Sequence, residues 1–167
     1  LRRDRSFAHG IRTIVYLAGI AALGSAPASA ADGVLEINQS CAVETGCFAG
    51  DTAGLPVTIS TAGSYRLTSN LTITSATTTG IAIDASDVSL DLGGFSIQGP
   101  VTCTGTGATL VCLPNGSPGG TGSGVLALST ATDAISVTNG VVKGMGANGI
   151  LLSGRRSTVH QVRVYSN

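Results

Sequence analysis

The chain has 167 residues, of which 43% are hydrophobic and 4% aromatic, and nine basic residues balance nine acidic ones. With only 11% charged residues, it has no concentration of positive charge of the kind that binds nucleic acid or an anionic membrane surface. We therefore expect no nucleic acid among its partners.

Residues 1–30 have the pattern of a cleaved secretory signal peptide. Four arginines open the segment, residues 13–23 are apolar, and a small-x-small triplet ends at Ala30. As a helix, the apolar run would span about 16 Å, whereas a bilayer core is about 30 Å thick. We expect cleavage after Ala30, a secreted, periplasmic or cell-surface location, and no membrane span in the mature chain.

The mature chain carries five basic and eight acidic residues, a net charge of −3. The sequence as a whole begins with Leu1 in place of methionine, and it stops at Asn167 inside a predicted repeat. We interpret it as a fragment of a longer protein.

Four cysteines follow the signal peptide, which favours disulfides in an oxidising compartment. Cys41 and Cys47 are six positions apart, and Cys103 and Cys112 are nine apart. Neither spacing is the tight pair of a zinc site, and the mature chain has a single histidine. We predict two local disulfides, Cys41–Cys47 and Cys103–Cys112. Residues 31–56, which hold the first pair, are predicted to form an N-terminal cap.

From Val57 onward, short runs of alternating apolar residues recur, separated by glycine, asparagine and aspartate, which is typical of short β-strands. The runs repeat: Val137 and Val159 are 22 positions apart, and Val125 and Ile150 are 25 apart. We predict an all-β chain, a right-handed parallel β-helix (a single-stranded solenoid) over residues 57–167 that is incomplete at the C-terminus. Residues 100–123 are predicted to interrupt it as a long loop. The turns that need left-handed backbone are assigned to Gly93, Gly94, Asn139 and Gly140.

The alternative fold is an antiparallel β-sandwich, which predicts no fixed repeat. One detail of the preferred fold stays open. If Val125 aligns with Ile81, then Leu126 and Leu128 point outward. Either this strand is slipped by one residue or another segment covers its outer face.

The stretch from Val57 to Gly99 resembles the opening of right-handed β-helix proteins of the pectate-lyase-like superfamily. The matching motifs are Gly63-Ser64-Tyr65-Arg66-Leu67, then Ile81 to Gly99, and Val137-Thr138-Asn139-Gly140-Val141-Val142-Lys143-Gly144. The resemblance implies an architecture of stacked coils. It also implies a polysaccharide or cell-surface glycan as partner, with lyase, hydrolase or epimerase activity in many members and calcium as a cofactor in some.

We find no catalytic constellation among the residues present and no identifiable cofactor or metal site. Asp84, Asp87 and Asp91 fall in eight residues, but the alternation places them in turns or towards solvent. Arg155 and Arg156 are the weak candidates for binding the carboxylates of an acidic sugar.

Two further motifs are interpreted as structural. Gly144 to Gly149 match the dinucleotide pattern G-x-G-x-x-G, but a strand follows in place of the required helix. His160 has no identifiable nucleophile as a partner and is assigned to an exposed strand.

Two functions remain open. The first is a carbohydrate-active enzyme whose catalytic coils lie mostly beyond Asn167. The second is a non-catalytic surface, adhesion or structural protein. We expect a monomer in either case.

Overall fold

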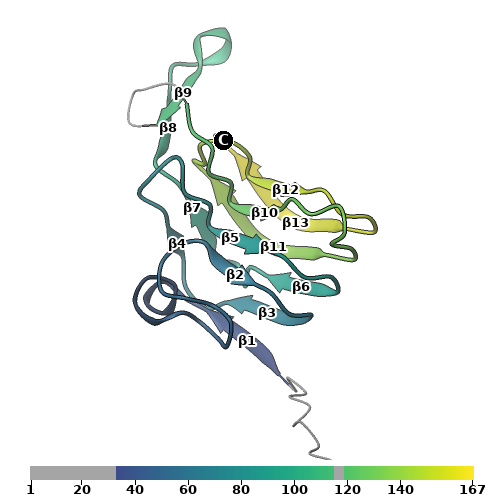
Figure 1. Ribbon diagram of the computed structural model, residues 1–167. Helices are drawn as coiled ribbons and strands as arrows, with labels where there is room; N and C mark the ends of the chain where they lie inside the picture. The colour runs from purple at the N-terminus through teal and green to yellow at the C-terminus, as the bar shows by residue number, and fades with distance from the viewer. Residues whose placement is uncertain (1–32, 115–118) are drawn as a thin grey trace, which may run out of the picture. The chain divides into compact units, whose positions relative to one another are not determined.

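The computed structural model describes residues 33–114 and 119–167, so the predicted signal peptide lies outside the described residues (Figure 1). The described chain is dominated by β-strands that pair in parallel sheets, which confirms the all-β class.

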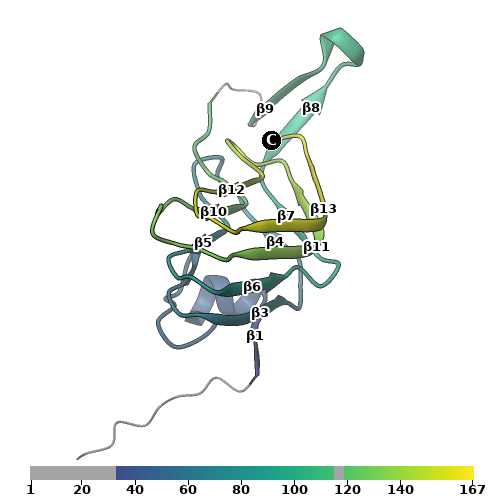
Figure 2. The same cartoon turned by 90° about the vertical axis from the view of Figure 1, so that its right-hand side faces the viewer.

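The larger sheet has seven strands in the order β1-β3-β6-β11-β7-β4, with β13 paired to β11 (Figure 2). A second sheet has the order β12-β10-β5-β2. The strands of the larger sheet are β1 (Val34–Ile37), β3 (Gly63–Leu67), β4 (Leu71–Thr72), β6 (Val88–Asp91), β7 (Ser96–Gln98), β11 (Ser136–Lys143) and β13 (Thr158–Tyr165). Those of the second sheet are β2 (Val57–Ile59), β5 (Ile81–Ile83), β10 (Val125–Ala127) and β12 (Ile150–Leu152).

Strands that share a sequence pattern pair directly with one another. Val137 of β11 pairs with Val159 of β13, and Val125 of β10 pairs with both Ile81 and Ile150. Every ladder in these two sheets is parallel, which excludes the antiparallel sandwich. The predicted alignment of equivalent strands is therefore confirmed.

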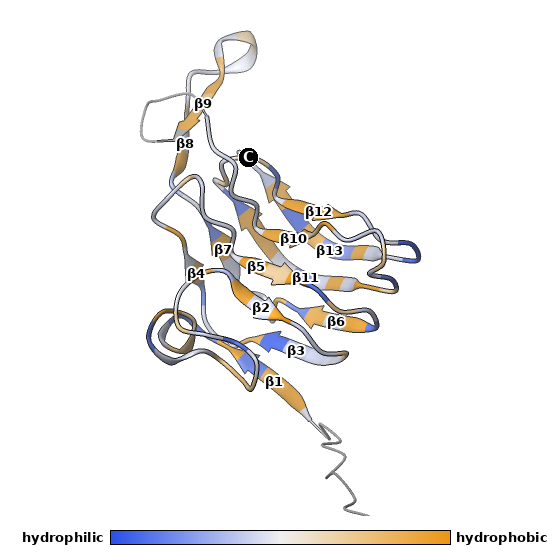
Figure 3. Cartoon of the chain, in the orientation of Figure 1, coloured by the Kyte–Doolittle hydropathy of each residue, from blue (hydrophilic) through white to orange (hydrophobic). Residues whose placement is uncertain are grey.

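The core consists of apolar side chains stacked across successive strands. Leu90 and Val137 are partners in adjacent strands, as are Ile97 and Val142, and all four are fully buried. The colouring in Figure 3 shows hydrophobic positions alternating with polar ones along the strands. Each fully buried aliphatic side chain stabilises the fold by roughly 1.5–3 kcal/mol before the entropy of ordering is counted.

The register also settles the position of Leu126 and Leu128. Because Val125 aligns with Ile81, β10 is not slipped. Leu126 is half-buried, whereas Leu128 is 61% exposed, so no segment among the described residues covers it.

Residues 33–56 extend the larger sheet and then close over its first strands. After β1 comes a short π-helical segment, η1 (Cys41–Thr45), with a Cys41–Cys47 disulfide. The Asp51 carboxylate accepts hydrogen bonds from the backbone N–H groups of Cys47 (2.8 Å) and Thr58 in β2 (2.9 Å). Two segments are thereby joined through one side chain.

The predicted loop of residues 100–123 contains regular structure. Strands β8 (Val101–Thr104) and β9 (Val111–Pro114) pair antiparallel, a 3-10 turn η2 (Gly107–Thr109) lies between them, and Cys103 is bonded to Cys112. In Figures 1 and 2 this hairpin extends away from the parallel strands. Because this segment is rich in glycine and threonine, the sequence did not indicate its two four-residue strands, which a disulfide joins.

The three glycines and the asparagine that the sequence assigns to turns are required for different reasons, some for left-handed backbone and one for lack of space. Gly93 (φ 61°), Gly94 (φ 81°) and Asn139 (φ 56°) have left-handed backbone. Gly140 does not, and it follows Asn139 inside the continuous strand β11, where the prediction placed a turn between two strands. A Cβ at Gly140 would collide with the Leu92 side chain and approach the Phe95 carbonyl to 2.8 Å, so the constraint is lack of space.

The last strands of both sheets are paired on one side only within the described chain. Val159 and Val164 of β13 are 48% and 45% exposed, whereas their partners Val137 and Val142 are completely buried. The core columns therefore reach solvent at this edge.

Candidate functional site

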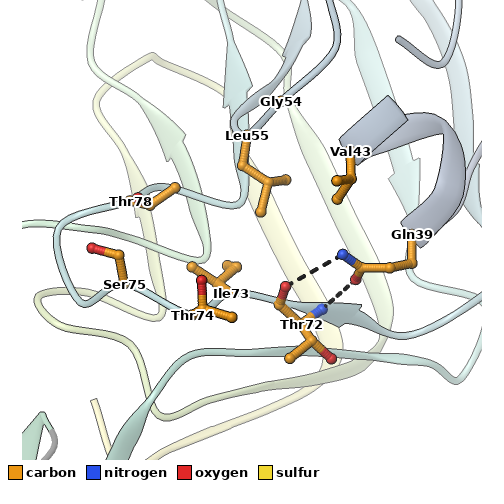
Figure 4. Close-up of a pocket in the computed structure, with 9 residues that line it drawn as sticks. All are labelled: Gln39, Val43, Gly54, Leu55, Thr72, Ile73, Thr74, Ser75 and Thr78. Atoms are coloured by element: carbon orange, nitrogen blue, oxygen red, sulfur yellow. Dashed lines mark hydrogen bonds between the residues drawn. The ribbon is translucent and has the colours of Figure 1, made fainter. Parts of the chain in front are cut away.

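A cleft of about 440 Å³ lies beside the first strands, between the η1 segment and strand β4. In Figure 4 the side chains of Val43 and Leu55 lie on one side of the opening, and the segment from Thr72 to Thr74 lies on the other. Ser75 and Thr78 complete the polar wall. The volume is within the range of pockets that hold small ligands.

A side-chain amide fixes one wall of the cleft. The Gln39 Oε1 atom accepts a hydrogen bond from the Thr72 backbone N–H at 2.6 Å, and Gln39 Nε2 donates to the Thr72 carbonyl at 3.4 Å (Figure 4). These are the groups that a neighbouring strand would otherwise pair with, and β4 is the last strand on its side of the larger sheet. Gln39 therefore substitutes for a strand and connects η1 to the edge of the sheet.

The chemistry of the cleft is neutral. Thr74 and Thr78 carry hydroxyl groups for which the described residues supply no hydrogen-bond partner, and the Ser75 hydroxyl is paired with Thr77 at 2.9 Å. Val43, which is 50% exposed, adds apolar surface. All the described residues that line the cleft have uncharged side chains, so the cleft offers hydrogen bonds and apolar contact.

The predicted sugar-binding arginines do not contribute to this cleft. Arg156 forms an ion pair with Asp133 at 2.8 Å, and Arg155 is exposed at the turn before β13. Neither side chain lines this cleft. Arg156 therefore already has a carboxylate partner within its own chain.

The aspartates likewise do not come together. Asp84 and Asp87 are exposed, and Asp91 pairs with Arg66 at 3.1 Å while its other oxygen accepts a hydrogen bond from the Gly93 N–H at 2.8 Å. Across residues 33–114 and 119–167, no three side chains of the metal-ligating types lie together.

The remaining candidates occupy structural positions. His160 is exposed on β13. Gly144 follows the end of β11 and Gly149 directly precedes β12, so a strand follows the glycine motif and the dinucleotide interpretation fails.

Sequence reasoning did not find the cleft. Its walls come from segments more than thirty positions apart, which Gln39 and Thr72 join, and such a contact leaves no periodic signal.

Comparison with protein-family models, curated proteins and solved structures found no match. The two disulfides are typical of an oxidising environment, extracellular or periplasmic. In the part of the chain that is described, no helix has the length and apolarity needed to cross a bilayer.

Proposed function

We propose that the chain winds into a right-handed parallel β-helix and belongs to an exported protein related to the pectate-lyase-like superfamily. Three observations support this architecture: parallel ladders in two sheets, pairing of equivalent strands such as Val137 with Val159, and buried columns between them. Parallel strands in one sheet are almost always connected with right-handed chirality.

We further propose that this domain binds a polysaccharide without cleaving it, and that it does so as a monomer. The observation that carries the proposal is the cleft beside β4, in which hydroxyl groups and apolar side chains are combined and ionisable groups are lacking. A neutral sugar ring has hydroxyls at its edge and C–H groups on its faces, so it matches both kinds of surface. The cleft volume of about 440 Å³ suits a short stretch of such a chain.

The cleft can be tested by filling it. Val43 is half-exposed and directed at the opening, so Val43→Trp should block the cleft without disturbing the core. We expect wild-type protein to bind neutral oligosaccharides in isothermal titration calorimetry and V43W to bind at least tenfold more weakly.

A matched control is available at Leu128, which is exposed and lies outside the cleft. Leu128→Trp adds the same side chain and should retain wild-type affinity. Equal affinity for V43W and wild type, with circular dichroism showing both folded, would place sugar binding elsewhere and overturn the proposal.

A further inference from the structure

A second, smaller cavity of about 110 Å³ lies where strands β7, β11 and β13 run side by side. Its polar side chains are Gln98, Lys143, Tyr165 and Ser166, and Gly99, Val101 and Gly144 complete its lining. It shares no lining residue with the cleft beside β4.

The strand register brings these three side chains together. Lys143 of β11 pairs with Gln98 of β7 on one side and with Tyr165 of β13 on the other. The preceding residues Ile97 and Val142 are fully buried, so alternation directs Gln98 and Lys143 outward. Adjacent strands lie about 4.8 Å apart, which places the three side chains in one row across the outer face of the sheet.

The charge in this row is uncompensated. Among the described residues, the ion pairs are Arg66 with Asp91 and Arg156 with Asp133, and neither involves Lys143. No acidic side chain lines the cavity. The Arg163 guanidinium lies 5.8 Å from the centre of the Tyr165 ring and adds a second positive charge nearby.

The size of the cavity limits what it can hold. At about 30 Å³ per water molecule, 110 Å³ accommodates three or four waters, which is enough for one small charged group. The Lys143 ammonium, the Gln98 amide and the Tyr165 hydroxyl come from three strands, and the Ser166 hydroxyl follows β13. This set of donors matches a group with three terminal oxygens better than a carboxylate with two.

We propose that this cavity binds the tetrahedral oxyanion of a sulfate or phosphate ester. That the ester is carried by a glycan rests on the proposed function, whereas binding of the anion does not. The anion itself is recognised by Lys143, Gln98 and Tyr165.

The site can be tested with the anions alone. Wild-type protein is titrated with inorganic sulfate, inorganic phosphate and acetate at constant ionic strength, and the backbone amide signals of Lys143 and Gly144 are followed by NMR. We expect saturable shifts with sulfate and phosphate and binding of acetate at least fivefold weaker. Lys143→Gln should weaken sulfate binding at least tenfold because it removes the charge-assisted hydrogen bond.

Two further variants separate loss of the site from a change in net charge. Arg155→Gln also removes one positive charge, but Arg155 is exposed and lies outside the cavity, so the substitution should leave the affinity for sulfate unchanged. Tyr165→Phe keeps the ring, removes one donor and should cause a smaller loss than K143Q. Absence of saturable shifts, equal binding of acetate, or equal affinity in K143Q and wild type would overturn the proposal.

The same oligosaccharide is then prepared with either a sulfate or a phosphate ester, and the affinity of each form is measured. The form that binds more tightly identifies the ester that the site selects. V43W should lose neutral oligosaccharide and retain inorganic sulfate, whereas K143Q should do the reverse. Failure of one proposal is therefore distinguishable from failure of the other.

Discussion

At the scale of single residues, the same residue type is constrained for different reasons. Gly93 and Gly94 adopt left-handed backbone, as the sequence predicts for a turn. Gly140 lies in extended structure, and it is constrained because Leu92 occupies the space that a side chain would need. Sequence alone predicts that a glycine is needed, but packing shows which property of glycine is used.

Gly140→Ala tests this distinction. The added methyl group would overlap the Leu92 side chain in a closely packed region, and overpacking of this kind destabilises by about 1–3 kcal/mol. The free energy of unfolding from urea titration measures it. Gly33→Ala is the control, because nothing lies within 4 Å of the new Cβ, and a loss as large as that of G140A would contradict the packing explanation.

At the scale of elements, side chains take the place of missing strands at the N-terminal end. Gln39 pairs with the backbone of β4, and Asp51 accepts hydrogen bonds from β2 and from Cys47. Phe48 packs against Tyr65 with ring centres 5.1 Å apart. The Gln39 and Asp51 contacts occupy backbone groups of β4 and β2 that would otherwise offer an edge for association.

Asp51→Ala removes both hydrogen bonds at once. The Thr58 and Cys47 N–H groups are left without their acceptor, so we expect unfolding to become easier by about 1–3 kcal/mol in urea titration. Asp51→Asn keeps one oxygen acceptor, so its free energy of unfolding should fall by less than that of Asp51→Ala. An equal loss in both variants would indicate that charge, and not the two hydrogen bonds, is responsible.

The two disulfides should differ in their effect on global stability. Cys47 packs against the hydrophobic core, whereas the described residues of the β8–β9 hairpin lie outside that cluster and, apart from Val101, are not buried. Cys41→Ser/Cys47→Ser should cost roughly 2 kcal/mol by the chain-entropy relation for a short loop. Cys103→Ser/Cys112→Ser should change the unfolding midpoint little, because the hairpin can open locally.

Far-UV circular dichroism in urea compares the two double variants with wild type. Similar losses in both would show that the hairpin unfolds together with the parallel sheets.

At the scale of the whole molecule, features that repeat could be predicted and features that occur once could not. The pairing of Val137 with Val159 followed from a period of 22 residues. The hairpin strands and the contact between Gln39 and Thr72 occur once, so no period indicated them. The neutral cleft, which depends on that contact, was therefore invisible to sequence analysis.

The stacking of strands predicts a gradient of local stability. Strand β13 pairs on one side only within the described chain and is largely exposed, whereas β11 is paired on both sides. In native-state hydrogen exchange, the amide of Val164 should exchange faster than that of Val142. Equal protection would show that the sheet opens as a single unit.

The proposal that this domain binds a polysaccharide without cleaving it can be tested directly. We expect no turnover of polygalacturonate, with or without calcium, as measured by the appearance of new reducing or unsaturated ends. Measurable cleavage by the purified chain would contradict the proposal of binding without cleavage.

The β8–β9 hairpin enters the chain between two strands that still pair in register, because Ile81 and Val125 are 44 positions apart and align as Val125 and Ile150 do across 25. The parallel sheets therefore tolerate about twenty additional residues between β7 and β10 without any change in the pairing of β5 with β10. Protein engineers could graft a foreign epitope between Cys103 and Cys112, where the disulfide would clamp the ends of the insert and the scaffold beneath would keep its order.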